Sequence, residues 1–184
     1  MNINYLLFSV VFIFFSFIVF RVKIKRDYKN IQRFSMFSTI LAILVFAVHA
    51  NSVYLILPTK WPYLPQMPEN TVTVNIFRVM LGVGIIILLL SWLKLGAKVT
   101  IGIDKSKLQT KGMYKYSRNP QLVGYGFILA SFTIIYFSYT MLFWFLNYLI
   151  TAYFMVKSEE EFLYQKYKEE YKDYCRQVPR IIKL

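Results

Sequence analysis

The stretch that decides the fold is residues 118–157, RNPQLVGYGFILASFTIIYFSYTMLFWFLNYLITAYFMVK. Between Arg118 and Lys157 lie 38 uncharged residues, about twice the ~20 helical residues that cross a bilayer core. One continuous helix of this length would be too long for a bilayer, so we predict two membrane helices in a hairpin. No Gly or Pro marks the turn, which we expect near residues 136–139.

Three further apolar runs precede the hairpin, at residues 4–20, 34–57 and 72–95. The chain of 184 residues is 57% hydrophobic and 17% charged, an apolar content well above that of an ordinary soluble domain. We therefore predict an all-α, polytopic membrane helix bundle with about five transmembrane helices, in which residues 1–184 form a single membrane domain. After Lys157, apolar residues recur every three or four positions, which predicts a C-terminal amphipathic cytoplasmic helix.

The basic residues predict the orientation of the bundle. All but two of the 22 Lys and Arg residues fall at residues 21–33, 94–118 and 157–183, and each cluster flanks an apolar run. By the positive-inside rule, this pattern predicts a multi-pass protein with its N-terminus outside and its C-terminus in the cytoplasm. The same clusters are suited to attract anionic lipids at the cytoplasmic surface. They account for the net charge of +13 without nucleic acid, for which no usual motif is present.

The chain has one cysteine, Cys175, and one histidine, His49. A metal site needs several ligands, and no second ligand type is placed to join His49. We therefore predict no metal and a hydrogen-bonded packing role for His49 within its span. For Cys175 we expect a position on the helix face that meets the lipid interface.

Two polar segments flank the hairpin, GMYKYSRNPQLVG at residues 112–124 and EEE at residues 159–161. A hairpin brings both to the same face of the bilayer, where a polar pocket can form. Each segment alone has an ordinary explanation, since Asn119-Pro120 suits a helix start and acidic residues suit the first turn of an exposed helix. Their joint occurrence in this order favours a functional site.

These segments resemble the isoprenylcysteine carboxyl methyltransferase and phospholipid methyltransferase superfamily of integral-membrane enzymes. Members carry Gly-Pro-Tyr, then Arg-His-Pro or Arg-Asn-Pro, a nearby Gly, and later a Glu-Glu pair. The corresponding residues here are Gly112-Met113-Tyr114, Arg118-Asn119-Pro120, Gly124 and Glu159-Glu160. The resemblance covers residues 105–182, with Met113, Asn119 and Leu122 in place of the usual Pro, His and Tyr.

The resemblance implies that S-adenosylmethionine is held between the last hairpin and the C-terminal helix, and that a lipophilic methyl acceptor enters from the bilayer. Residues 105–182 would form the cofactor-binding methyltransferase region. Carried over residue by residue, the cofactor-binding residues are Leu108, Gln109, Tyr114, Asn119, Pro120, Gln121, Leu122 and Glu159. Arg118 and Glu160 would be the catalytic residues, which organise the site or meet the acceptor headgroup.

Two other interpretations stay open. Sterol-reductase-like membrane enzymes that use NADPH have a somewhat similar Arg-Asn-Pro segment, although they lack the Glu-Glu helix that follows here. The chain could also be a non-catalytic membrane module that retains the fold. The acceptor is open as well, among a prenylated cysteine carboxylate, a phospholipid amine, a small thiol and an isoprenoid quinone precursor.

Overall fold

The computed structural model describes residues 3–95 and 108–182. All elements in this part of the chain are helices, as the sequence predicts. They are α1 (Ile3–Phe17), the π-helical η1 (Ile18–Ile24), α2 (Lys25–Ile31), α3 (Met36–Asn51), the 3₁₀ helix η2 (Ser52–Leu55), α4 (Thr71–Leu95), the 3₁₀ helix η3 (Gly112–Lys115), α6 (Pro120–Ile135) and α7 (Tyr139–Gln177).

Four continuous helical stretches are long and apolar enough to cross a membrane: Ile3–Ile31, Met36–Leu55, Thr71–Leu93 and Tyr139–Gln177. The fifth apolar helix, α6, has 16 residues and is shorter than the ~20 that a full crossing requires. The chain is therefore a multi-pass membrane protein with four to five apolar helices, in agreement with the predicted class.

The predicted hairpin is present, because α6 ends at Ile135 and α7 begins at Tyr139. Ser138 caps α7, its side-chain oxygen accepting a hydrogen bond from the Met141 N–H at 3.1 Å. The Tyr136 hydroxyl donates to the Pro65 carbonyl at 2.8 Å, which ties this turn to the proline-containing loop between α3 and α4. A serine N-cap thus replaces the Gly or Pro that commonly marks such a turn.

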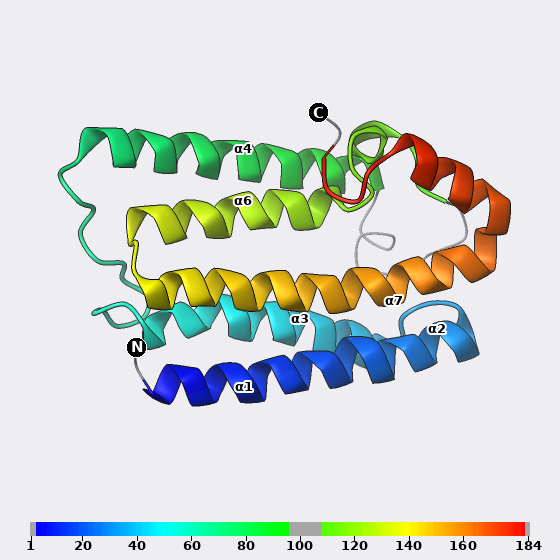
Figure 1. The fold of residues 1–184 in the computed structure, drawn as a ribbon, viewed down its shortest axis with the longest axis horizontal. Helices are drawn as coiled ribbons and strands as arrows, with labels where there is room; N and C mark the ends of the chain where they lie inside the picture. Colours follow the sequence, from blue (N-terminus) through cyan, green and yellow to red (C-terminus); the bar gives the residue numbers. More distant parts are fainter. Residues whose placement is uncertain (1–2, 96–107, 183–184) are drawn as a thin grey trace.

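In projection, the long helices follow one another in the order α4, α6, α7, α3 and α1 (Figure 1). α4 and α6 approach so closely that a Cβ on Gly84 would lie 2.7 Å from the Gly124 carbonyl oxygen. The reciprocal contact, from a Cβ on Gly124 to the Gly84 oxygen, would be 2.8 Å. Small residues permit such backbone contact between membrane helices, and here they fix where α6 starts relative to α4.

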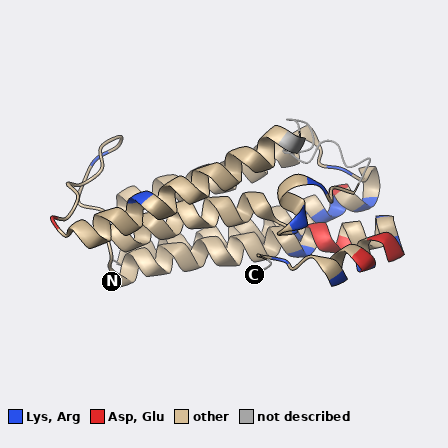
Figure 2. Cartoon of the chain, turned by 90° about the horizontal axis from the view of Figure 1, so that it is seen from above, with Lys and Arg blue, Asp and Glu red and all other residues tan. Residues whose placement is uncertain are grey.

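Charged side chains gather at one end of the bundle, while the rest of the helices carry few (Figure 2). We call this the charged end and define it as the described residues within 21–33, 111–118 and 157–182. It lies opposite the turn between α6 and α7. Both polar segments that flank the hairpin in the sequence therefore meet there, as predicted.

Two helices are longer than the sequence predicted. The first does not end near residue 20 but continues through η1 and α2 to Ile31, because Tyr28 is buried and stacks on Phe162 of α7 with ring centroids 4.2 Å apart. The predicted C-terminal amphipathic helix is present as the last part of α7, and no loop separates it from the last membrane helix. A break at Lys168 (φ 45°, ψ −113°) bends that last part back toward the start of α6 (Figure 1).

Candidate functional site

The charged end is organised around Glu160 of α7, whose carboxylate forms ion pairs with two arginines. Arg118, just before α6, lies 2.9 Å from Oε1, and the two side chains are only 15% and 18% exposed. Arg180, in the C-terminal tail, donates from Nε to Oε1 at 2.9 Å and from Nη2 to Oε2 at 2.6 Å. This fork geometry is the strong form of an arginine–carboxylate pair. The predicted catalytic residues Arg118 and Glu160 therefore touch one another.

Arg118 is held from several sides. Its Nη1 also lies 2.9 Å from Cys175 Sγ and 3.4 Å from the Tyr171 hydroxyl, both on α7 beyond the break at Lys168. Its backbone N–H donates to the Pro179 carbonyl at 3.0 Å. The expected position of Cys175 at the lipid interface is thus wrong, because the bend in α7 turns this face onto Arg118.

Glu161 connects the site to the first helix, a link that the sequence analysis missed. Its carboxylate lies 2.8 Å from Arg21 Nη2 and 2.8 Å from Lys25 Nζ. Arg21 also donates to the Ser158 hydroxyl at 3.0 Å, and Ser158 in turn donates to the Phe20 carbonyl at 2.8 Å. The i, i+4 spacing of Arg21 and Lys25 places both on one helix face, the available sequence signal for a shared partner.

Glu159 faces the tyrosines of the charged end. Burial raises the pKa of Tyr114 well above its ordinary value, and the nearby Glu159 carboxylate and the Tyr174 side chain raise it further. Tyr114 is therefore a neutral hydrogen-bonding group and not a base. The Tyr174 hydroxyl donates to the Tyr114 carbonyl at 2.7 Å, which fixes η3 against α7. The predicted Tyr114 and Glu159 thus share one region.

The segment from Ser117 to Leu122 connects the two arginines to α6. Asn119 donates from its backbone to the Ser117 hydroxyl and from Nδ2 to the Arg180 carbonyl, both at 3.0 Å. Pro120 is buried and starts α6, where a missing N–H costs nothing. The Leu122 carbonyl accepts a hydrogen bond from the Tyr148 hydroxyl. Of the four predicted positions, Asn119 therefore contacts Arg180, and residues 120–122 follow it as the first turn of α6.

The other two predicted cofactor-binding positions, Leu108 and Gln109, come just before the charged-end segment 111–118 in the sequence. Leu108 packs against the buried cluster of Tyr171, Tyr174 and Val178, and it lines a polar groove of about 440 Å³. Gln109 is its half-buried neighbour. The groove is also lined by Thr110, Lys115, Glu170, Asp173 and Gln177. Among the described residues, no hydrogen bond or ion pair joins Leu108 or Gln109 to Arg118 or Glu160.

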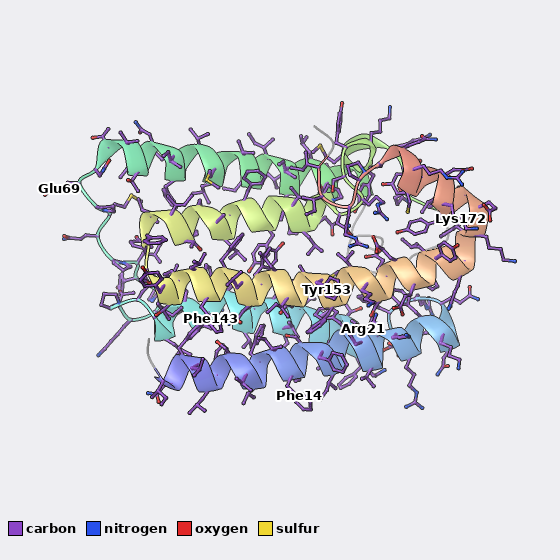
Figure 3. All side chains as sticks on the ribbon, viewed as in Figure 1. Phe14, Arg21, Glu69, Phe143, Tyr153 and Lys172 are labelled. Carbon is purple, nitrogen blue, oxygen red and sulfur yellow. The ribbon has the colours of Figure 1, made fainter. Side chains whose placement is uncertain are left out.

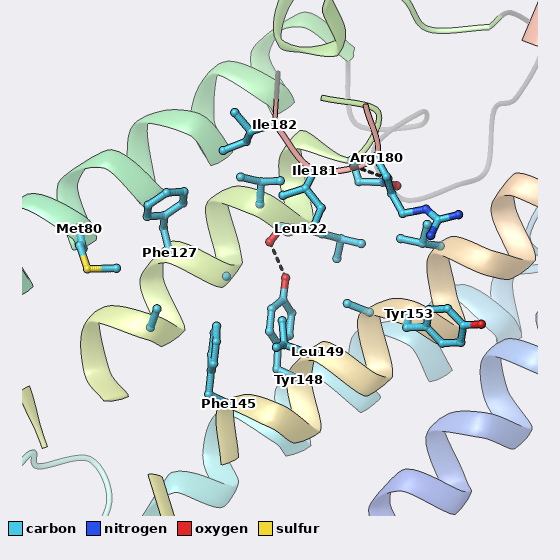
Figure 4. A pocket seen from close by; sticks show the side chains of 16 residues that line it. Met80, Leu122, Phe127, Phe145, Tyr148, Leu149, Tyr153, Arg180, Ile181 and Ile182 are labelled. Atoms are coloured by element: carbon cyan, nitrogen blue, oxygen red, sulfur yellow. Dashed lines mark hydrogen bonds between the residues drawn. The ribbon is translucent and has the colours of Figure 1, made fainter. Parts of the chain in front are cut away.

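An apolar cavity of about 570 Å³ opens beside the arginine–glutamate cluster, between α4, α6, α7 and the tail (Figure 4). Asn119 and Arg180 lie at one end of it. Its other lining residues are Met80, Leu122, Val123, Gly126, Phe127, Ala130, Phe145, Tyr148, Leu149, Ala152, Tyr153, Val156, Ile181 and Ile182. A mostly apolar pocket with a few convergent polar groups is the usual form of a ligand site.

Three buried polar atoms in or next to the charged end have no hydrogen-bond partner among the described residues: Tyr28 Oη, Arg118 Nε and Gln121 Nε2. An unpaired buried polar group costs stability unless a ligand or water satisfies it. Each of these atoms could therefore pair with a bound ligand or a water molecule.

The described residues hold no group of three or more His, Cys, Asp or Glu that could bind a metal. His49 is buried beside Trp144, with Nε2 3.0 Å from the Trp144 carbonyl, while Trp144 Nε1 donates to the His49 carbonyl at 2.9 Å. This reciprocal pair joins α3 to α7, in keeping with a packing role.

The fold and the site define a multi-pass membrane protein with a polar, arginine-led centre beside an apolar cavity. The family model for phospholipid methyltransferases matches residues 75–170, just over half of the chain. The chain belongs to the phospholipid methyltransferase family. The match covers most of α4, all of α6 and α7 as far as Glu170, including the three glutamates, and it supports the superfamily inferred from the sequence motifs. No curated protein and no solved structure gives a match.

Proposed function

We propose that this chain is an integral-membrane, S-adenosylmethionine-dependent methyltransferase that acts on a lipophilic acceptor. One observation carries the proposal: the Arg118–Glu160 pair, 2.9 Å apart, is bound to Arg180, which lines an apolar cavity, in a chain of the phospholipid methyltransferase family. A polar centre next to an apolar cavity suits a reaction between a charged donor and a lipid-like acceptor.

S-adenosylmethionine would supply an electrophilic methyl group for in-line displacement. The protein's part is then to align the reactants and to exclude water, which needs no protein nucleophile. The residues proposed to hold the cofactor are Leu108, Gln109, Tyr114, Asn119, Pro120, Gln121, Leu122 and Glu159. Among them, Gln121 offers a buried Nε2 donor without a partner among the described residues, and Glu159 offers a carboxylate for an amine or hydroxyl donor.

Arg118 and Glu160 would organise the site and meet the reacting groups at the mouth of the cavity. The acceptor would place its apolar part in the cavity after entering from the bilayer. We further propose that the charged end faces the cytoplasm, that the N-terminus lies outside, and that the basic residues of the charged end attract anionic lipids.

A binding titration tests the proposed function. Isothermal titration calorimetry measures the binding of S-adenosylmethionine and, separately, of NADPH to the purified protein in detergent. We expect uptake of S-adenosylmethionine, and roughly tenfold weaker binding in Glu159→Gln, because a hydrogen bond to a charged group is lost. Glu169→Gln is the matched control, since Glu169 lies on the same helix and its side chain is 73% exposed.

Binding of NADPH in place of S-adenosylmethionine would overturn the proposal in favour of a reductase. Binding of neither would favour a non-catalytic membrane module.

A further inference from the structure

The last residues that the structure describes, 178–182, form a short tail that returns from α7 across the start of α6 (Figure 1). Neither the methyl donor nor the family match requires a role for this tail. Two features set it apart: it is fastened to the arginine–glutamate cluster at several points, and its end lines the apolar cavity.

The fastening uses both backbone and side chain. The Pro179 carbonyl accepts from the Arg118 N–H at 3.0 Å, and the Arg180 carbonyl accepts from Asn119 Nδ2 at 3.0 Å. The Arg180 guanidinium is bound at two points to Glu160, at 2.9 and 2.6 Å. The tail position is thus coupled to the same side chains that form the site.

The tail end supplies apolar surface to the cavity. Ile181 and Ile182 line it together with Leu122 of α6, opposite Tyr148 and Leu149 of α7 (Figure 4). Yet both isoleucines remain partly uncovered, 66% and 37% exposed. In the protein alone, these two side chains bury little of their apolar surface. An apolar ligand in the cavity would bury more of it, which is favourable.

We propose that the tail is a wall of the acceptor site, in which Ile181 and Ile182 limit the length of the apolar chain that fits. Arg180 is the positioning residue that holds this wall against Glu160. The inference rests on the proposed function in that it takes the cavity as the acceptor site. The occupant to which it commits is a molecule with a linear aliphatic or isoprenoid body, because most of the lining side chains are apolar, and the polar Asn119 and Arg180 lie at one end.

Photo-crosslinking tests the wall without any methyl transfer. The full chain in phosphatidylcholine nanodiscs is exposed to straight-chain alkyl diazirines of increasing length, and mass spectrometry locates the labels. We expect labels on cavity residues such as Phe127 and Leu149 up to a limiting chain length. Ile182→Trp should shorten this limit, with about fourfold weaker labelling for each methylene that no longer fits. Ile182→Ala should lengthen it.

The control is Leu93→Trp, a tryptophan at a side chain on α4 that is 81% exposed and outside the cavity lining, and it should leave the limit unchanged. Arg180→Gln should make labelling fall more gradually with chain length, because the tail is no longer bound to Glu160. An unchanged limit in both Ile182 variants would overturn the inference. A lack of S-adenosylmethionine binding in the unmodified protein, with the shift in limit retained, would instead overturn the proposed function alone.

Discussion

The membrane-spanning part of the bundle and its charged end are held together by different means. In the membrane part, helices meet through close backbone contact at Gly84 and Gly124 and through buried polar pairs such as His49 and Trp144. At the charged end, Glu160 and Glu161 of α7 pair with Arg21 of η1 (labelled in Figure 3), Lys25 of α2, Arg118 just before α6 and Arg180 of the tail. The first region therefore sets the architecture, and the second sets the positions of the charged side chains.

The largest effect is expected from breaking the centre of the charged end. Arg118→Met should lower methyl transfer by on the order of 100-fold, because loss of alignment at a reacting centre costs this much. The measurement is the initial rate of label transfer from S-adenosylmethionine to a total membrane lipid extract. Arg176→Met, at a guanidinium that is 75% exposed, is the control and should keep the rate. A rate in Arg118→Met equal to that of the control would contradict the placement of the site.

The second prediction tests the membrane part. Gly124→Ala places a Cβ 2.8 Å from the Gly84 oxygen, so α4 and α6 must separate. Overpacking of this kind typically costs about 1–3 kcal/mol of unfolding free energy. Unfolding by SDS titration in mixed micelles measures it.

Gly82→Ala is the matched control, because its Cβ would meet nothing within 4 Å. The better helix propensity of Ala should make this variant equally stable or more stable by ~0.5–1 kcal/mol. Equal destabilisation of the two variants would mean that backbone contact does not hold α4 to α6.

The third prediction concerns the link between the charged end and the first helix. The Glu161 carboxylate is 33% exposed, and Glu161→Gln removes its charge. The variant should therefore weaken the contacts to Arg21 and Lys25. A partly exposed ion pair contributes about 0.2–1 kcal/mol, so the loss in unfolding free energy should lie in this range. Hydrogen exchange supplies a sharper measurement, since amides of α2 (Lys25–Ile31) should exchange faster while those of α4 stay unchanged. Faster exchange in α4 as well would indicate a general loosening.

Much of the fold and the outline of the site were predictable from the sequence. The charge-free run between Arg118 and Lys157 fixes the hairpin, and the hairpin brings the arginine-led segment and the glutamates to one end. The sequence did not predict which partners Glu159, Glu160 and Glu161 contact. Consecutive helix residues point about 100° apart, so these three side chains must face different neighbours. Which neighbour each one meets depends on tertiary packing.

The roles of Arg180 and Cys175 depend on the break at Lys168, where a non-glycine residue adopts a positive φ. The amphipathic pattern runs on through this position, so periodicity alone predicts a straight helix. Burial of Tyr171 and Tyr174 against Leu108 accompanies the bend and brings the tail back to α6. Such a long-range contact leaves no local signal in the sequence.

The smallest effect is expected from Asp173→Asn. This variant allows a comparison of two arginine–carboxylate pairs that have almost the same distance. Arg176 lies 3.0 Å from Asp173, and Arg118 lies 2.9 Å from Glu160. The first pair is 75% and 61% exposed, so water and salt screen it, and its loss should change the unfolding free energy by no more than a few tenths of a kcal/mol. Methyl transfer should stay at the unmodified rate at both low and high ionic strength. A large loss of methyl transfer in Asp173→Asn would show that the rate depends on the total charge of this end and not on one buried pair. If Asp173→Asn keeps the rate while Arg118→Met loses it, the importance of the Arg118–Glu160 pair comes from its burial and its shared partners. Distance cannot explain the difference, because it is nearly the same in both pairs.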